Sequence, residues 1–364
     1  MIRTTRAHLN VDAQTHAGMT GKNNEDRYAV ASFVVDKNDR TPVLLAILSD
    51  GIGGHRAGEV AAELAVNHIM QAVAHSDGLQ IRDTIEDAVV EASDAIAAHA
   101  QANQNLKGMG ATCAVAWIVG DRLHTAYVGD SRIYLMRGGR IQQLTVDHTW
   151  VQEAIDRGVL TPEAAREHPN VHVIRRYLGS PSPPEPDFRL KLFNDEGNQN
   201  AENNQGLKLL PNDMLLLCSD GLTDLVWNDE ILEVVRSRPN LKEATRALVE
   251  LANSRGGHDN TTVILISVPS DFKFVPRKHV NWVPWIIGSA VAIVLLLVVG
   301  SVFALALLRQ EADPTVTSTV TLTPTQTPRP SPTVTPLPTM TILPTLSLPI
   351  APTYTPWPTN TVSP

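Results

Sequence analysis

Acidic side chains stand at or beside the ends of apolar runs in five short motifs of this 364-residue chain. They are Glu25 and Asp26 in NNEDRYAV, Asp50 in ILSDGIGG, Asp130 in YVGDSRIY, Asp220 in LLCSDGL and Asp259 in GGHDNTTV. One Asp beside Gly at a strand end is most often a turn residue. Five such motifs predict more, because carboxylates brought together repel one another unless a cation neutralises them. Oxygen ligands select hard ions, so we expect Mg²⁺ or Mn²⁺.

The stretch SDGIGGHRAGE, residues 49–59, adds four glycines to one of these acids directly after the apolar run VLLAIL. A turn needs one or two glycines, so this density indicates that the backbone approaches a metal or a phosphate closely.

The composition excludes several classes of protein. A formal net charge of -8 argues against a nucleic-acid partner, which requires a basic face. Cys113 and Cys218 are far apart, and each lies in an apolar run, so we expect reduced core cysteines and neither a disulfide framework nor a zinc site. The N-terminus lacks the apolar segment of a signal peptide, which predicts a cytoplasmic N-terminal part.

The chain changes character after residue 270. We expect a folded domain at 1–270, a juxtamembrane linker at 271–282 and a transmembrane helix at 283–308, whose 26 residues carry no charge. That length exceeds the roughly 20 residues that span a bilayer. The basic stretch 277–279 precedes the span and predicts a single-pass cell-membrane protein with its N-terminal side in the cytoplasm. The Pro/Thr-rich segment 309–364 is expected to be a disordered extracytoplasmic tail.

Within 1–270 the hydrophobic pattern indicates an α+β domain with helices packed on an antiparallel sheet. RGGR at 137–140 predicts a hairpin turn, and the polar stretch 194–206 predicts a surface loop. We expect strands at 43–49, 111–119, 123–128, 132–137, 213–218 and 261–268, and helices near 58–74, 81–101, 147–157, 161–168 and 241–253.

In this order, the motifs NNED, SDGIGGHRAGE, GMGAT, VGDSR, CSDGLTD and GGHDNTTV resemble the metal-dependent protein phosphatases of type 2C. The likeness spans roughly residues 10–268, and it is greatest for the bacterial Ser/Thr phosphatases that act opposite membrane Ser/Thr kinases. It implies a four-layer α-β-β-α sandwich, in which helices flank two antiparallel sheets. It also implies hydrolysis of phosphoserine and phosphothreonine on proteins by a hydroxide that bridges two Mn²⁺ or Mg²⁺ ions.

The resemblance implies a role for each matched position. Asp50, Asp220 and Asp259 would be the catalytic acids. Asp50 would bridge both metal ions, Asp220 and Asp259 would hold the first ion, and Glu25 and the Gly51 carbonyl would hold the second. Asp130 would help to bind a weaker third ion. Asp26 would orient water ligands, and Asn260 would brace Asp259. The segment 145–180 resembles the flap that lies beside the cleft in this family.

Two positions depart from the family pattern. Gly21 stands where the family often has an arginine that grips the phosphate, which leaves Lys22 and Arg27 as the candidates for that role. In a regular strand, Arg27 would share the face of Glu25 and Lys22 would lie on the other face. Ile52 stands where animal relatives have a histidine proposed as a general acid. His55 could supply that acid or could simply open the following helix.

Two other functions stay open at this point. A membrane-anchored pseudophosphatase would bind phosphoproteins without turnover, and a stress-signalling phosphatase would act on an anti-sigma antagonist. The intact motifs favour a phosphatase with phosphoprotein substrates and a membrane Ser/Thr kinase as its partner.

Overall fold

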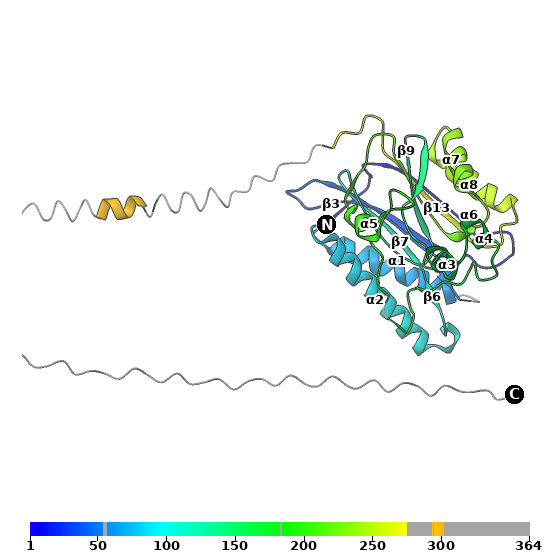
Figure 1. Cartoon of the computed structure of the whole chain (residues 1–364). Helices are drawn as coiled ribbons and strands as arrows, with labels where there is room; N and C mark the ends of the chain where they lie inside the picture. Colours follow the sequence, from blue (N-terminus) through cyan, green and yellow to red (C-terminus); the bar gives the residue numbers. More distant parts are fainter. Residues whose placement is uncertain (54–56, 183, 275–292, 294, 302–364) are drawn as a thin grey trace, which may run out of the picture. The chain divides into compact units, whose positions relative to one another are not determined.

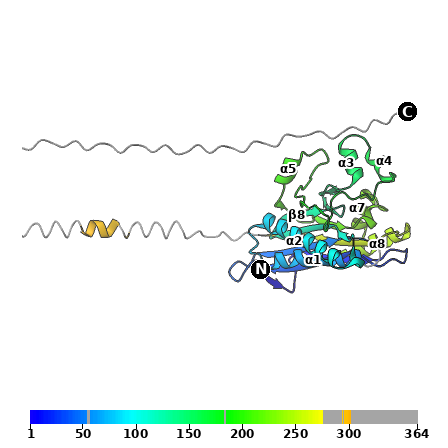
Figure 2. The same cartoon turned by 90° about the horizontal axis from the view of Figure 1, so that it is seen from below.

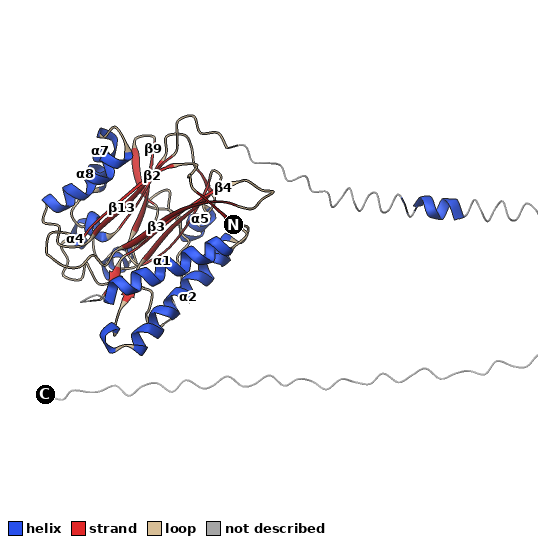
Figure 3. Ribbon diagram, turned by 180° about the vertical axis from the view of Figure 1, so that it is seen from behind, coloured by secondary structure: helices blue, strands red, loops and turns tan. Residues whose placement is uncertain are grey.

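The computed structural model describes residues 1–53, 57–182, 184–274, 293 and 295–301 (Figure 1). The chain divides into two units, and the described residues up to 274 belong to the first. In the first unit two antiparallel sheets lie face to face, with helices on both outer faces (Figures 1 and 3). This arrangement confirms the expected sandwich of two antiparallel sheets and helices.

The centre of the first sheet is formed by strands that are apolar on both faces. In its central strand, Val43, Leu45 and Ile47 point into a core that includes the helices, and Leu44 and Leu48 point toward the other sheet. Strand order is β1 (Ile2–Thr4), β3 (Arg27–Val34), β4 (Pro42–Ser49), β7 (Cys113–Val119), β8 (Arg122–Val128) and β11 (Leu207–Lys208).

The second sheet packs against the first through residues such as Ile133, Leu217 and Ile264. Its opposite face, which includes Leu216 and Leu265, forms a separate core with helices. Strand order is β10 (Arg140–Gln143), β9 (Arg132–Arg137), β12 (Met214–Cys218), β13 (Thr261–Ser267) and β2 (Asn10–His16). A small extra sheet pairs β5 (Gly51–Ile52) with β6 (Gly110–Ala111).

Two pairs of helices cover the sandwich (Figure 3). The pair α1 (Ala57–His75) and α2 (Ile81–Ala102) covers the first sheet, and the pair α7 (Asn228–Ser237) and α8 (Leu241–Ser254) covers the second. In Figure 2 the segments carrying α3 (Trp150–Asp156), α4 (Pro162–Arg166) and α5 (Asn198–Asn203) lie away from α1. A 3-10 turn (Gln104–Leu106) follows α2, and the single residue Ser219 separates β12 from α6 (Asp220–Thr223).

Most predicted elements within 1–270 are confirmed, and three predictions are wrong. Strand 111–119 is interrupted at Thr112, where the chain passes from β6 to β7. The polar stretch 194–206 contains α5, because Ala201 is fully buried and anchors a short helix. Residues 20–26 are irregular, and β3 starts only at Arg27, so the alternation argument for Lys22 and Arg27 does not apply. Both cysteines are buried and free, as expected.

The predicted transmembrane helix and tail fall almost wholly outside the described residues. Of 283–308, residues 293 and 295–301 are described, and they are helical. Within the described parts of the chain, we find no helix with the length and apolarity that crossing a bilayer requires.

Candidate active site

Four of the six predicted acids converge on one cleft of about 680 Å³. They come from loops at one edge of both sheets: before β3, after β4, after β12 and before β13. The residues that line the cleft include Glu25, Asp50, Asp220 and Asp259, together with Gly21, Lys22, Gly51, Ile52, Ile174 and Asn260.

Glycines permit the close backbone contacts beneath this cleft. A Cβ atom on Gly51 would lie 2.2 Å from the Gly58 carbonyl oxygen and 2.8 Å from that of Glu25. A Cβ on Gly58 would lie 2.5 Å from Glu25 Oε2. A Cβ on Gly221, beside Asp220, would lie 2.0 Å from the Asn260 carbonyl oxygen. The glycines around Asp50 and Asp220 therefore let the acid-bearing loops touch through their backbones.

Thr112 fixes the backbone of Asp50. The Asp50 N–H donates to Thr112 Oγ1 at 2.9 Å, and the Thr112 N–H donates to the Asp50 carbonyl at 2.8 Å. Thr112 Oγ1 also lies 2.7 Å from Ser131 Oγ, next to Asp130. Thr112, which interrupts the strand between β6 and β7, thus holds the backbone of Asp50 and links it to the loop that carries Asp130.

Asn260 joins the loops of Glu25 and Asp259. Its Oδ1 accepts from the Glu25 N–H at 2.6 Å, and its own N–H donates to Asp259 Oδ1 at 2.8 Å. Its Nδ2 donates to the carbonyls of Ala17 at 3.1 Å and Asn23 at 3.0 Å. The backbone of Asn260 thus contacts the Asp259 carboxylate, while its side chain holds the loop that carries Glu25.

Asp26 is buried beneath the cleft. Ser219 Oγ donates to its Oδ2 at 2.8 Å, whereas its buried Oδ1 has no hydrogen-bond partner among the described residues. Burial, with a smaller contribution from the charge of Asp259, raises the pKa of Asp26 to about 6. A buried carboxylate oxygen without a donor is costly, and a cation or its water would satisfy it.

Crowding also acts on the other acids. Burial, followed by the charges of neighbouring carboxylates, raises the pKa of Asp50 and of Asp220 well above the usual range. Burial raises the pKa of Asp130 to about 7, with Asp147 adding to the effect. So many buried acids within reach of one another fit an oxygen-ligand site for hard divalent cations, which would favour the charged forms.

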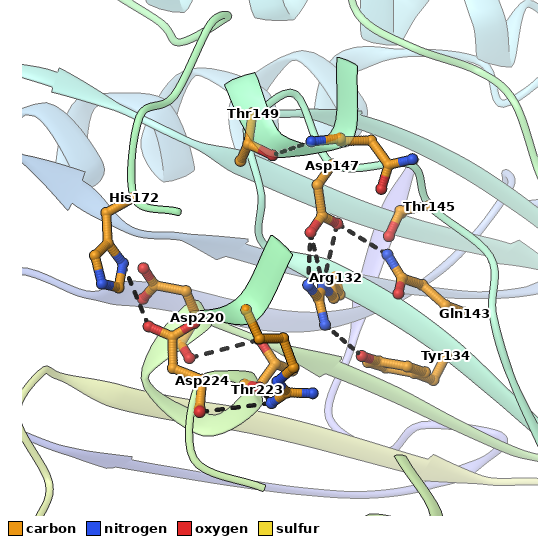
Figure 4. Close-up of polar contacts among 12 residues, drawn as sticks. Arg132, Tyr134, Gln143, Thr145, Asp147, Thr149, His172, Asp220, Thr223 and Asp224 are labelled. Carbon is orange, nitrogen blue, oxygen red and sulfur yellow. Dashed lines mark hydrogen bonds and ion pairs between the residues drawn. The ribbon is translucent and has the colours of Figure 1, made fainter. Parts of the chain in front are cut away.

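Asp130 itself is buried but is not among the residues lining the cleft. Asp220 and Asp224 lie with His172 of the flap, so that one ligand-type atom of each is within 4.8 Å of the others (Figure 4). The sequence reasoning missed His172 and Asp224. The DGLTD motif could have indicated Asp224, because residues four apart share one face of a helix. No motif in the sequence indicated His172.

The phosphate-binding and acid candidates have different outcomes. Lys22 lines the cleft. Arg27 forms an ion pair with Glu59 and donates to the carbonyls of Asn24 and Asp26, so its guanidinium braces the backbone beside the cleft. His55 lies outside the described residues.

Comparisons with known proteins agree with this geometry. The family model described as protein phosphatase 2C matches residues 13–260. Protein phosphatase PhpP of Streptococcus pneumoniae is 34% identical over 270 residues, covering 71% of this chain and 98% of that protein. The structure of a Streptococcus agalactiae serine/threonine phosphatase aligns with a TM-score of 0.62 and 34% identity, covering 72% of this chain and 100% of the other.

A second solved structure is the catalytic domain of the serine/threonine protein phosphatase PstP in complex with 2 manganese ions. It aligns with a TM-score of 0.59 and 34% identity, and it covers 72% of this chain and 98% of that one. The fold, the convergence of the acids and these matches lead to one conclusion: the chain belongs to the protein phosphatase 2C family and is a protein-serine/threonine phosphatase.

Proposed function

We propose that the cleft hydrolyses phosphoserine and phosphothreonine on proteins with the help of two Mn²⁺ or Mg²⁺ ions. Asp50, Asp220 and Asp259, with Glu25 and the Gly51 carbonyl, would hold these ions. The observation that carries the proposal is the convergence of four acids from four separate loops on one cleft. The PstP structure with 2 manganese ions supports divalent cations as the cofactor.

The chain's own residues would prepare the reaction. When bound, such ions supply an activated water and neutralise charge on the phosphoryl oxygens. Asp50 is held by Thr112, and Asp259 by Asn260, so that the carboxylates keep their spacing. Lys22 at the cleft would attract the phosphate as a point charge. Ile52 and Ile174 would exclude water from one wall.

A weaker third ion is proposed at Asp130. Its carboxyl is buried close enough to Asp50 and Asp220 for its charge to raise the pKa of both. Thr112 and Ser131 link the Asp130 loop to Asp50, which supports a shared electrostatic role.

We further propose that residues 283–308 anchor the enzyme in the cell membrane, with the catalytic domain in the cytoplasm and the tail outside. The charge-free span and its basic N-terminal flank support this topology. Anchoring would raise the effective concentration of the phosphatase near a membrane Ser/Thr kinase. If the kinase is the partner, deleting 275–364 raises phosphosite levels in cells, and unchanged levels contradict this partnership.

The test of the enzyme compares phosphate release from a phosphothreonine peptide with Mn²⁺, with Mg²⁺ and with chelator. Wild type, Asp50→Asn and the exposed-loop control Asp195→Asn are measured side by side as full chains. We expect metal-dependent turnover in wild type and the control, and loss in Asp50→Asn of at least ~100-fold. Absence of turnover from a folded, metal-loaded wild type would instead favour the pseudophosphatase.

A further inference from the structure

The end of the sandwich opposite the cleft, which we call the distal end, is built from the far ends of the same strands that lead to the acids. β4, β12 and β13 each have a cleft acid next to one end, so Pro42, Met214 and Ser267 mark the other end. Met214 lies opposite both Ser267 and Met136, which brings the hairpin turn after β9 to this end as well. The segments that meet there are 1–9, 35–41, 76–80, 120–122, 137–140, 208–213, 236–243 and 268–274.

The distal end differs in charge from the rest of the domain. Its segments carry 12 Lys or Arg against 7 Asp or Glu, whereas the rest of residues 1–274 carries 14 against 29. The acids of the cleft belong to that remainder and lie at the opposite end of the sheets. The domain is therefore polarised, and an anionic surface would attract its distal end and repel its other faces.

Four exposed cations of the distal end form no ion pair within the described parts of the chain. These residues, which we call the basic cluster, are Arg140, Arg236, Arg238 and Lys242. Arg236 Nη1 would lie 3.5 Å from a Cβ atom on Gly139, so it reaches the turn of the RGGR hairpin. Arg238 and Lys242 line one surface hollow together with Met214 and Ser267. The cluster thus joins the hairpin to the ends of α7 and α8.

Nearby acids do not neutralise the basic cluster. Asp213 is taken up by Arg137, whose Nη2 lies 2.6 Å from its carboxylate. Glu233 and Glu243, on the same two helices as the cluster, form no ion pair among the described residues, and they are fewer than the cations around them. The turn of the hairpin carries no side chain between its arginines, because Gly138 and Gly139 adopt the positive φ angles of 57° and 79°. The cluster therefore keeps its positive charge toward solvent.

The chain leaves the domain at this same end. The Phe272 ring lies 6.1 Å from the ring of His8, and a Cβ atom on Gly120 would come within 2.5 Å of the Phe274 ring. In the sequence, the basic stretch 277–279 and the charge-free run 283–308 follow. The eight residues 275–282 can reach at most roughly 30 Å when fully extended. Anchoring by 283–308 would therefore keep the distal end within that distance of the bilayer.

We propose that the basic cluster docks the distal end on anionic phospholipid headgroups and turns the cleft away from the bilayer; this inference rests on the proposed anchoring by 283–308. Each Lys or Arg close to an anionic membrane surface strengthens such binding by about 5-fold. The attraction fades over a Debye length of about 8 Å at physiological salt, so it acts only when the distal end faces the lipid. This orientation leaves the cleft open to phosphoprotein substrates.

The test places the full chain in vesicles of phosphatidylcholine, either alone or with about 30% phosphatidylglycerol. Amide hydrogen exchange is measured at 137–143 and 236–243 of the distal end, and at 19–24 of the cleft as an internal reference. We expect exchange at the distal end to be several-fold slower in the anionic vesicles only, with no change at the cleft. About 1 M salt should remove this protection, because the Debye length falls to about 3 Å.

A charge-matched pair of variants assigns the effect to the basic cluster. The triple variant Arg236→Gln, Arg238→Gln and Lys242→Gln should weaken docking by about 100-fold and remove the protection at 137–143. The control Lys107→Gln, Arg157→Gln and Arg246→Gln removes three exposed cations outside the distal end and should keep the protection. An unchanged melting temperature shows that the first triple variant is folded.

The outcomes separate docking from anchoring. Flotation of the full chain with neutral vesicles tests the anchor alone, and a chain that is protected on anionic vesicles without floating on neutral ones refutes the anchor and keeps the docking surface. Equal exchange in both kinds of vesicle, or protection that persists in the triple variant, would overturn docking by the basic cluster. Protection by soluble polyglutamate but not by anionic vesicles would make the cluster a site for an acidic protein and would also overturn it.

Discussion

Replacing Gly51 by alanine tests whether backbone contact, and not the acids alone, builds the site. The new Cβ would lie 2.2 Å from the Gly58 carbonyl oxygen and 2.8 Å from the Glu25 carbonyl oxygen. Both neighbours are backbone atoms, so neither can rotate away as a flexible side chain could. The new side chain would therefore press the Asp50 loop against the first turn of α1 and against the loop that carries Glu25.

The size of the effect follows from these distances. Ordinary contact of a Cβ atom begins at 3.4 Å, so the Asp50 loop would have to move about 1.2 Å from the Gly58 carbonyl of α1 and about 0.6 Å from the Glu25 carbonyl. Overpacking of this kind costs about 1–3 kcal/mol of stability. A displacement of about 1 Å in a reacting group can cost 10²-fold in rate. We therefore expect a domain that still folds, with a kcat/KM on phosphopeptide at least ~100-fold below wild type.

The assay combines thermal melting, Mn²⁺ titration and phosphopeptide kinetics. Gly197→Ala is the matched control, because its Cβ meets no atom within 4 Å. We expect Gly51→Ala to bind Mn²⁺ more weakly and the control to match wild type. Wild-type activity and Mn²⁺ affinity in Gly51→Ala would refute the argument that the close approach of these loops sets the positions of Asp50 and Glu25.

Two further predictions separate charge from structure. Lys22→Ala should raise KM for phosphopeptide several-fold and leave the melting temperature unchanged. Arg27→Ala should leave KM unchanged and cost about 1 kcal/mol of stability, because it removes the ion pair with Glu59. The reverse pattern would mean that Arg27, and not Lys22, binds the phosphate. The pKa of Asp26 is raised to about 6 in the folded protein, so the folded state holds the proton more tightly than the unfolded chain does. The stability that this proton contributes is fully present below the pKa of Asp26 in the unfolded chain and is lost as the pH rises through 6. In chelator, wild type should therefore lose stability relative to Asp26→Asn over that range, as measured by urea denaturation, and parallel curves would contradict the shift.

The elements most accurately predicted were those with a strong apolar pattern. The periodic positions Ile85, Val89, Ala92 and Ile96 are buried on α2, and VLLAILS forms the central strand β4. The strands β2 and β3 and the helix α7 were not predicted. Their polar faces, as in NVDAQTH of β2, weaken the local pattern, and only pairing with β13 makes that segment a strand.

The residue types and motif order of this chain determined the acids of the site, because chemistry that needs hard cations restricts the side chains to carboxylates. The register of two antiparallel sheets decided which acids meet, since Glu25, Asp50, Asp220 and Asp259 lie far apart along the chain and share one edge only after folding. Tertiary contacts also decided what no motif records. Arg27 pairs with Glu59, and His172 of the flap lies beside Asp224. These partners come from distant segments, and only the packing of those segments brings them together.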